Sequence, residues 1–179
     1  MLNIVEEIIF NFSNNKSLYI GEDLTMSEHM IQTAMLAEEN ECSDDLICSC
    51  LLHDYGHFVI NDPNRLVSDD IDGRHEAIGA NYLNNFFHLK IIEPILLHVD
   101  AKKYLARDEK YFNSLSEASK ISLKLQGGIM SDEEAKKFEQ NKNYENAIKL
   151  RRFDEGAKRQ NIKTKDIKDY KKLLISKII

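Results

Sequence analysis

Histidine and aspartate side chains are the residues of this sequence whose types and spacing could do chemistry. The clearest case is segment 51–57, LLHDYGH, in which an apolar run ends in His53 and Asp54. A carboxylate beside a buried run needs a partner. Adjacent histidine and aspartate side chains at a helix end can bind one metal ion, and a carboxylate can also bridge two ions. A helix-terminal aspartate beside a hydrogen-bonded histidine would look the same, so this pair alone leaves both interpretations open.

Three more histidines are predicted to face the protein interior from separate helices. His29, His75 and His98 each share a helix face with apolar residues at spacings of three, four or seven. A single histidine on such a face is usually a hydrogen-bonded core residue. Four helices that each turn a histidine inward are hard to explain by packing, and imidazoles with carboxylates suit zinc, iron or manganese better than calcium or magnesium. His88 has no place in this pattern and is expected at a helix end on the surface.

The elements that must position these residues are predicted to be helices. The 179 residues include only seven glycines and two prolines, well below the roughly 12% of average usage. Capping-box pairs predict helix starts at Thr25, Ser114 and Ser131, and Pro94 is expected in the first turn of its helix. The expected fold class is all-α, with segment 58–72 as the longest loop. The predicted helices are at about 2–12, 25–40, 44–55, 73–87, 92–105, 114–126, 131 onward, 143–160 and 165–177.

The composition describes a soluble globular chain. Hydrophobic residues make up 42% and charged residues 30%, and no stretch approaches the roughly 18 consecutive apolar residues of a membrane span. The net charge of −6 argues against a nucleic acid or an anionic membrane as partner, although a local cationic cluster can still bind a small anion. Glu6 and Glu7 interrupt the N-terminal apolar run, so a secretory signal is not expected. Cys42, Cys48 and Cys50 form no CxxC pair and are expected to be reduced, in a cytoplasmic protein.

The pattern of His29, His53, Asp54 and Asp154 resembles the HD-domain superfamily. The added His75 and His98 resemble the extra ligands of its dinuclear members. Within that superfamily the chain is similar to the PhnZ-type iron oxygenases of phosphonate degradation, through segments that run in order from 19 to 158. The most specific are LHVDAKKYL at 97–105 and LKLQGGIMS at 123–131, which separate these oxygenases from hydrolytic HD proteins. Asp100 and the lysine-rich C-terminus depart from the family's pattern.

The resemblance implies two iron ions in a mixed-valent Fe(II)/Fe(III) state, with O2 as cosubstrate. By position, the first iron would be held by His29, His53, Asp54 and Asp154. Asp54 would bridge to the second iron, which His75 and His98 would complete. Tyr19 and Glu22 stand where the family has the tyrosine and glutamate of a lid that covers an iron until substrate arrives. A loop aromatic that packs on the core is the alternative for Tyr19.

The resemblance also implies a pocket for a phosphonate dianion, lined by His57, Lys102, Ser119, Gln126 and Arg151. The helical spacing is consistent with this pocket, because Lys102 and Arg151 lie four residues after and three residues before an implied metal ligand. Ser119 and Gln126 are seven residues apart, two turns along one face. The two cations would supply charge-assisted hydrogen bonds to the anion. The alternative for such cations is a solvated helix face, but we expect Lys102 and Arg151 to point inward.

The function predicted from the resemblance is oxidative cleavage of the carbon–phosphorus bond of a 1-hydroxyalkylphosphonate. The first choice of substrate is 2-amino-1-hydroxyethylphosphonate, which would give glycine and phosphate, with Glu22 facing the ammonium group. The trimethylammonium analogue and hydroxymethylphosphonate stay open. A metal-dependent HD phosphohydrolase and a non-catalytic helical module with a degenerate metal site are the alternative functions.

The expected organisation is a single HD domain over residues 1–179, with a C-terminal helix within 161–179. The expected partner is a small-molecule phosphonate, with neither nucleic acid nor membrane. The sequence leaves the oligomeric state open.

Overall fold

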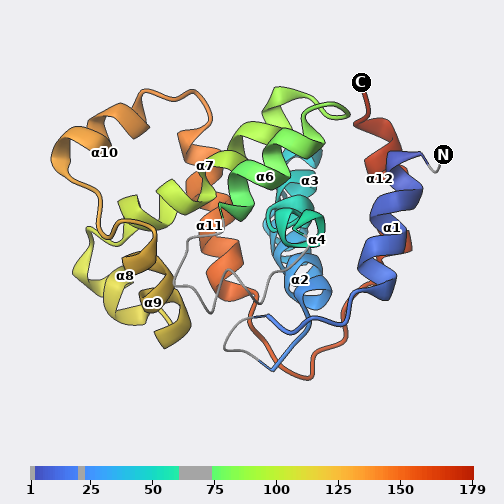
Figure 1. The fold of residues 1–179 in the computed structure, drawn as a ribbon, viewed down its shortest axis with the longest axis horizontal. Coiled ribbons are helices and arrows are strands. Elements are labelled where there is room, and N and C mark those ends of the chain that lie inside the picture. The colour runs from blue at the N-terminus through green and yellow to red at the C-terminus, as the bar shows by residue number, and fades with distance from the viewer. Residues whose placement is uncertain (1–2, 20–22, 61–73) are drawn as a thin grey trace.

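The computed structural model describes residues 3–19, 23–60 and 74–179, and these residues fold into packed helices (Figure 1). Within the described residues no strand forms, and extended pairing is limited to two isolated bridges, Leu18 with Thr25 and Phe87 with Ile178. The prediction of an all-α fold is therefore confirmed. The helices are α1 (Ile4–Asn14), α2 (Met26–Glu39), α3 (Asp44–Leu52), α4 (Gly56–Val59), α6 (His75–Leu83), α7 (Leu89–Leu105), α8 (Glu109–Ser114), α9 (Glu117–Leu125), α10 (Asp132–Glu139), α11 (Tyr144–Gly156), the 3-10 helix η1 (Ile167–Tyr170) and α12 (Lys171–Ser176).

The central helices come from distant parts of the chain. Helix α11 packs against α2, α3 and α7, and α6 packs against α4 and α7. In Figure 1, α1 and α12 lie together on one side of this centre, and α8, α9 and α10 lie on the other. The largest apolar core joins α1, α2, α3, α7 and α11 through fully buried side chains such as Ile8, Met30, Leu51, Ile95 and Leu150. This core holds the helices that carry the predicted metal ligands in fixed relative positions.

Two of the three predicted capping boxes are confirmed. Thr25 caps α2 and Ser131 caps α10, each in a reciprocal pair with the glutamate three residues later. The prediction at Ser114 is wrong. Ser114 is the last residue of α8, and its hydroxyl donates to a carbonyl of that helix, whereas Ser116 is the N-cap of α9. The error arose because the short helix α8 was not predicted.

Several helix ends differ from the prediction. Helix α7 begins at Leu89 rather than at 92, which places Pro94 inside the helix and not in its first turn. Helices α6 and α11 end at Leu83 and Gly156, short of the predicted 87 and 160, and the C-terminal segment is the turn η1 followed by a short α12. Phe87 is buried although it lies beyond the end of α6, so the apolar spacing continues past the helix itself.

Outside the central helices, His88 is exposed at the N-cap of α7, as predicted. The three cysteines are free thiols; Cys48 and Cys50 are buried and Cys42 is half-buried. In the described ranges, no helix has both the length and the apolar character that crossing a bilayer would require.

Candidate metal centre

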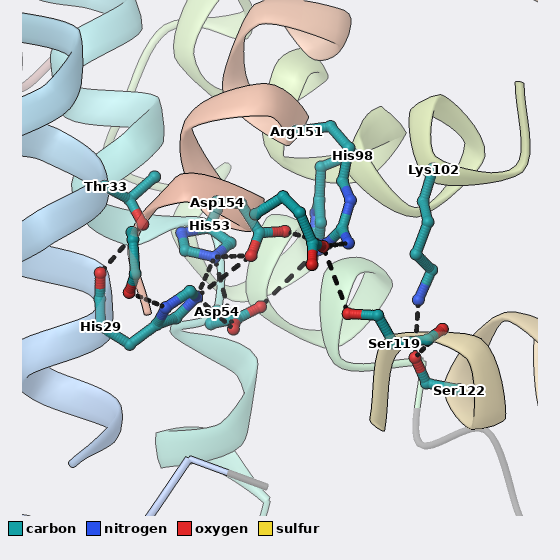
Figure 2. A network of polar contacts seen from close by, with 12 residues as sticks. His29, Thr33, His53, Asp54, His98, Lys102, Ser119, Ser122, Arg151 and Asp154 are labelled. Atoms are coloured by element: carbon teal, nitrogen blue, oxygen red, sulfur yellow. Dashed lines mark hydrogen bonds and ion pairs between the residues drawn. The ribbon is translucent and has the colours of Figure 1, made fainter. Parts of the chain in front are cut away.

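Six of the residues singled out in the sequence converge in the interior, and Figure 2 labels five of them. They come from the first turn of α2, the turn after α3, the first residue of α6, the middle of α7 and the last turn of α11. Their ligand atoms form two groups, and within each group all atoms lie within 4.8 Å of one another. The first group is His29, His53 and Asp154, and the second is Asp54, His75 and His98. Each group could hold one metal ion.

Backbone carbonyls fix the orientation of three imidazoles. The Nδ1 atom of His29 lies 2.9 Å from the carbonyl oxygen of Ala157. His53 and His98 make the same kind of contact with carbonyls three residues earlier, at 2.9 and 2.6 Å. A carbonyl oxygen can only accept, so Nδ1 carries a proton, and Nε2 of the neutral imidazole presents a lone pair. Metal-binding histidines adopt this arrangement.

The Nε2 atoms of the histidines approach each other in pairs. Nε2 of His29 lies 3.2 Å from Nε2 of His53, and Nε2 of His75 lies 3.2 Å from Nε2 of His98. When His29 and His53 are both neutral and carry their protons on Nδ1, both bring an acceptor to the contact and no proton lies between them. Two lone pairs that converge in a buried space require a cation to stabilise them, so the first pair fits a bound metal ion.

Asp54 lies between the two groups (Figure 2). Its Oδ2 atom is 3.3 Å from Nε2 of His53 and 3.7 Å from Nε2 of His29. Its Oδ1 atom is 3.2 Å from Nε2 of His75 and 3.6 Å from Nε2 of His98. One carboxylate thus presents a different oxygen to each group, which is the arrangement that a bridge between two metal ions requires.

Both aspartates are ionised in this environment. Burial alone would raise the pKa of Asp54, but His53 counteracts it and holds this pKa well below its usual value. Burial would likewise raise the pKa of Asp154, and Arg151 holds it well below its usual value. Among the described residues, Oδ1 of Asp154 is buried without a hydrogen-bond donor and lies 3.2 Å from Nε2 of His29. A buried, ionised oxygen without a proton donor fits a metal ligand.

Backbone contact between α4 and α6 positions the second group. A Cβ atom added at Gly56 would lie 1.9 Å from the carbonyl oxygen of His75, and one added at Gly79 would lie 2.8 Å from the backbone nitrogen of Gly56. Only glycine permits so close an approach. The contact brings the ring of His57 against that of His75, with centroids 4.5 Å apart and planes 16° from parallel. Burial, reinforced by His75, lowers the pKa of His57 to about 3, so this imidazole is neutral at neutral pH.

Lys102 and Arg151 both point inward, in agreement with the spacing (Figure 2). The Lys102 side chain donates from Nζ to Oγ of Ser122 at 2.8 Å, and the described residues supply it with no other acceptor. Burial, together with the charge of Arg151, lowers the pKa of Lys102 to about 7. Arg151 is held on two sides, because its guanidinium donates to the carboxylates of Asp154 and Glu155. Lys102 therefore has donors free for an anion, whereas Arg151 is already paired.

Of the other predicted site residues, Ser119 lies beside this cation pair (Figure 2). Ser119 is buried on α9, and Oε1 of Gln126, at the end of α9, is buried without a hydrogen-bond partner in the part of the chain that is described. Tyr19 stacks on His29 with ring centroids 3.9 Å apart and an interplanar angle of 25°. Burial and the neighbouring carboxylates raise the pKa of Tyr19 well above its usual value, so the phenol is neutral. Glu22 lies outside the described residues.

Two charged residues that the sequence reasoning missed join the same cluster. Oε2 of Glu155 accepts hydrogen bonds from Arg151 and Ser119, and Oε1 accepts one from Lys158. Lys158 also donates to Oγ of Ser119 at 2.8 Å. Glu155 follows Arg151 by four residues, and Lys158 follows Asp154 by four, so helical spacing could have indicated both.

The helical fold and the buried histidine–aspartate groups define the class of this protein. The HD domain family matches residues 26–173, and the chain belongs to this family. It is 45% identical over 167 residues to the [1-hydroxy-2-(trimethylamino)ethyl]phosphonate dioxygenase (glycine-betaine-forming) of Leisingera caerulea, covering 92% of this chain and 85% of that protein. It is 42% identical over 156 residues to the hydroxymethylphosphonate dioxygenase of Gimesia maris, covering 85% of this chain and 77% of that one. The recognition of an HD-domain enzyme related to phosphonate oxygenases is therefore confirmed.

Proposed function

We propose that this chain binds Fe(II) and Fe(III) side by side and uses O2 to cleave the carbon–phosphorus bond of a 1-hydroxyalkylphosphonate. The products would be a carboxylic acid and phosphate. The observation that carries the proposal is the position of Asp54 between two histidine pairs, in a chain similar to two phosphonate dioxygenases. Oxidation of the hydroxyl-bearing carbon to a carboxylate removes four electrons, which one O2 accepts, so no further reductant is needed per turnover.

The proposed ligands of the first iron are His29, His53, Asp54 and Asp154, and those of the second are Asp54, His75 and His98. Two iron ions in these positions would supply Lewis acidity toward the substrate oxygens and the redox chemistry that O2 requires. Imidazole and carboxylate ligands suit iron. The role of the protein is to keep the imidazole Nε2 atoms and the ionised carboxylates turned inward. The carbonyls of Ala157 and Cys50 support this orientation.

The proposed phosphonate-binding residues are His57, Lys102, Ser119, Gln126 and Arg151. Lys102 has a pKa of about 7, and a bound dianion would favour its protonated form. Arg151 is fixed by two carboxylates, so we assign it the role of setting the charge and orientation of the pocket wall. Neutral His57 can donate one N–H to a phosphonate oxygen. Oε1 of Gln126 has no partner among residues 3–19, 23–60 and 74–179, which supports a role for that amide toward the substrate hydroxyl.

Tyr19 is proposed to cover the first iron position before substrate binds. The support for this role is its neutral phenol and its ring stacked on His29. The role of Glu22 toward an ammonium group remains a prediction from the sequence.

The three candidate substrates differ in the group attached to the hydroxyl-bearing carbon. The names of the two relatives describe a trimethylamino substrate and hydroxymethylphosphonate, and the sequence favoured the primary amine. The test is to incubate anaerobically iron-loaded protein with each of the three phosphonates and O2, and to measure O2 uptake and phosphate release in the same sample. One phosphate per O2 with any of them supports the proposal. Phosphate without O2 uptake would indicate an HD phosphohydrolase, and no turnover with all three would overturn the proposed function.

A further inference from the structure

Lys158 links three parts of the candidate site. Its side chain is only 10% exposed and follows the end of α11. The Nζ atom donates to Oγ of Ser119 at 2.8 Å, to Oε1 of Glu155 at 2.9 Å and to Oγ of Ser116 at 3.3 Å. The same atom lies 5.7 Å from the centroid of the Tyr19 ring. All three protons of the ammonium therefore have acceptors, and its charge also faces an aromatic ring.

The contact with Tyr19 bears on the first metal group. The Tyr19 ring stacks on His29, which carries an Nε2 lone pair of that group. A cation near an aromatic face attracts it, and the attraction grows as the pair is removed from water. Lys158 thus holds the ring of Tyr19 in place beside His29.

The contact with Ser119 bears on the proposed phosphonate pocket. A serine hydroxyl has one proton to donate and two lone pairs. Because Lys158 donates to this oxygen, the Ser119 proton must point away from Lys158, and in the structure it is donated to Oε2 of Glu155. An anion bound near Ser119 and Arg151 would receive this proton once the hydroxyl turns from Glu155 toward it, while Lys158 keeps the oxygen in place.

We propose that Lys158 is a positioning residue, which fixes the Tyr19 ring beside the metal centre and holds the Ser119 oxygen so that its proton is available to the phosphonate. The inference has two halves. The Ser119 half, the effect on the Ser119 hydroxyl, rests on the proposed function, whereas the Tyr19 half, the effect on the Tyr19 ring, does not depend on the substrate. An ordinary i,i+3 surface pair with Glu155 would contribute little. A largely buried ammonium whose acceptors come from both α9 and α11, and which also faces Tyr19, is placed to join those segments.

The test compares Lys158→Met, which keeps the apolar stem and removes the charge, with Lys158→Arg, which keeps a donor cation. Lys149→Met is the matched control, because Lys149 is an exposed lysine on α11. The first measurement is amide hydrogen exchange of segment 17–26 in the anaerobically iron-loaded proteins. The amides of Tyr19 and Met26 report on it, since they donate to the carbonyls of Leu24 and Ser17 at 2.8 and 2.9 Å. The second measurement is the kinetics of phosphonate oxidation, and iron content is determined for each variant.

We expect Lys158→Met to speed exchange of this segment by about threefold or more and to raise KM for the phosphonate by about tenfold or more, with a smaller effect on kcat. In Lys158→Arg, the exchange rate and KM are expected to stay closer to the wild-type values, and Lys149→Met is expected to match the wild type. Unchanged exchange and KM in Lys158→Met would overturn the inference, as would loss of iron from both Lys158 variants, which would indicate a merely structural role. If the wild type itself oxidises no phosphonate, the proposed function and the Ser119 half fail together, and exchange alone decides the Tyr19 half.

Discussion

Asp54 presents one carboxylate oxygen to each histidine pair, so a change at this residue reaches both metal groups. We predict that Asp54→Ala weakens metal binding at both groups by at least about tenfold, whereas His98→Ala weakens only the group that contains Asp54 and His75. Metal analysis of the anaerobically iron-loaded variants measures the difference, with the wild type as reference. Equal iron retention by the two variants would contradict a bridging position for Asp54.

The buried thiols allow a prediction about reactivity. Burial raises the pKa of Cys48 to about 12 and that of Cys50 well above its usual value. The thiolate is the reactive form, and its fraction falls as the pKa rises above the ambient pH. We therefore predict that iodoacetamide at about pH 8 alkylates half-buried Cys42 first in the folded protein, while Cys48 and Cys50 react only after denaturation. Peptide mass spectrometry measures the order, and early labelling of Cys48 would show that α3 is not protected.

Helical spacing was sufficient to predict that Lys102 and Arg151 face inward. Lys102 follows His98 by one helical turn, so burial of one face buries both. The ion pairs of Arg151 were not predicted, because they depend on which carboxylates lie nearest its guanidinium once α11 is packed. The structure gives it to Asp154 and Glu155.

At the scale of elements, the contact between α4 and α6 depends on two glycines. A Cβ atom at Gly79 would lie 2.8 Å from the backbone nitrogen of Gly56, and neither backbone can yield as a flexible side chain could. We predict that Gly79→Ala destabilises the protein by about 1–3 kcal/mol and weakens metal binding at the group of His75. Thermal unfolding and metal titration measure both effects.

The control for Gly79→Ala is Gly156→Ala. A Cβ atom at Gly156 would lie 3.2 Å from Cδ1 of Leu36, the far end of a side chain that can shift. We expect a smaller loss of stability in this variant. A loss as large as that of Gly79→Ala would argue against the special closeness of α4 and α6.

The two capping boxes offer a matched pair of variants. Thr25 caps α2, which carries His29, whereas Ser131 caps α10, which carries no residue of either metal group. Loss of either cap is expected to cost about 1 kcal/mol, or about 2–4 °C in Tm for a chain of this size. We predict that Thr25→Ala also weakens metal binding and that Ser131→Ala does not. Thermal scans and metal titrations check this, and equal metal affinities would show that His29 is held by core packing alone.

Helix starts with polar caps were predicted more accurately than helix ends. The capping role of Thr25 and Ser131 can be read from local sequence, because their side-chain oxygens accept hydrogen bonds from backbone N–H groups of the first helical turn. The ends of α6 and α11 were predicted too late, since Phe87 is buried by the fold after its helix has stopped. Apolar spacing reports burial, and burial continues wherever the chain packs on the core.

At the scale of the whole molecule, the proposed ligands join parts of the chain that sequence separates widely. His29 and Asp154 belong to helices near opposite ends of the chain, and α2 packs on α11 in the structure. Within the described residues, imidazole nitrogens and ionised carboxylates converge in a buried space, an arrangement that a cation, either a metal ion or protons on the rings, must stabilise. Metal binding and the packing of the central helices are therefore expected to be coupled.

Removal of the metal tests this coupling. A ligand that binds only the folded state stabilises it by about 2.7 kcal/mol when its free concentration is about 100 times its dissociation constant, which corresponds to about 5–11 °C in Tm here. We predict that iron-loaded protein loses stability of this order on anaerobic treatment with a chelator, and that re-addition of Fe(II) restores it. Asp54→Ala serves as the control: its Tm should respond much less to the chelator, because that variant loses the carboxylate that faces both histidine pairs. An unchanged Tm of the wild type after complete removal of iron would mean that the five ligand-bearing segments are held by the apolar core alone, and the proposed link between the metal centre and the fold would then be wrong.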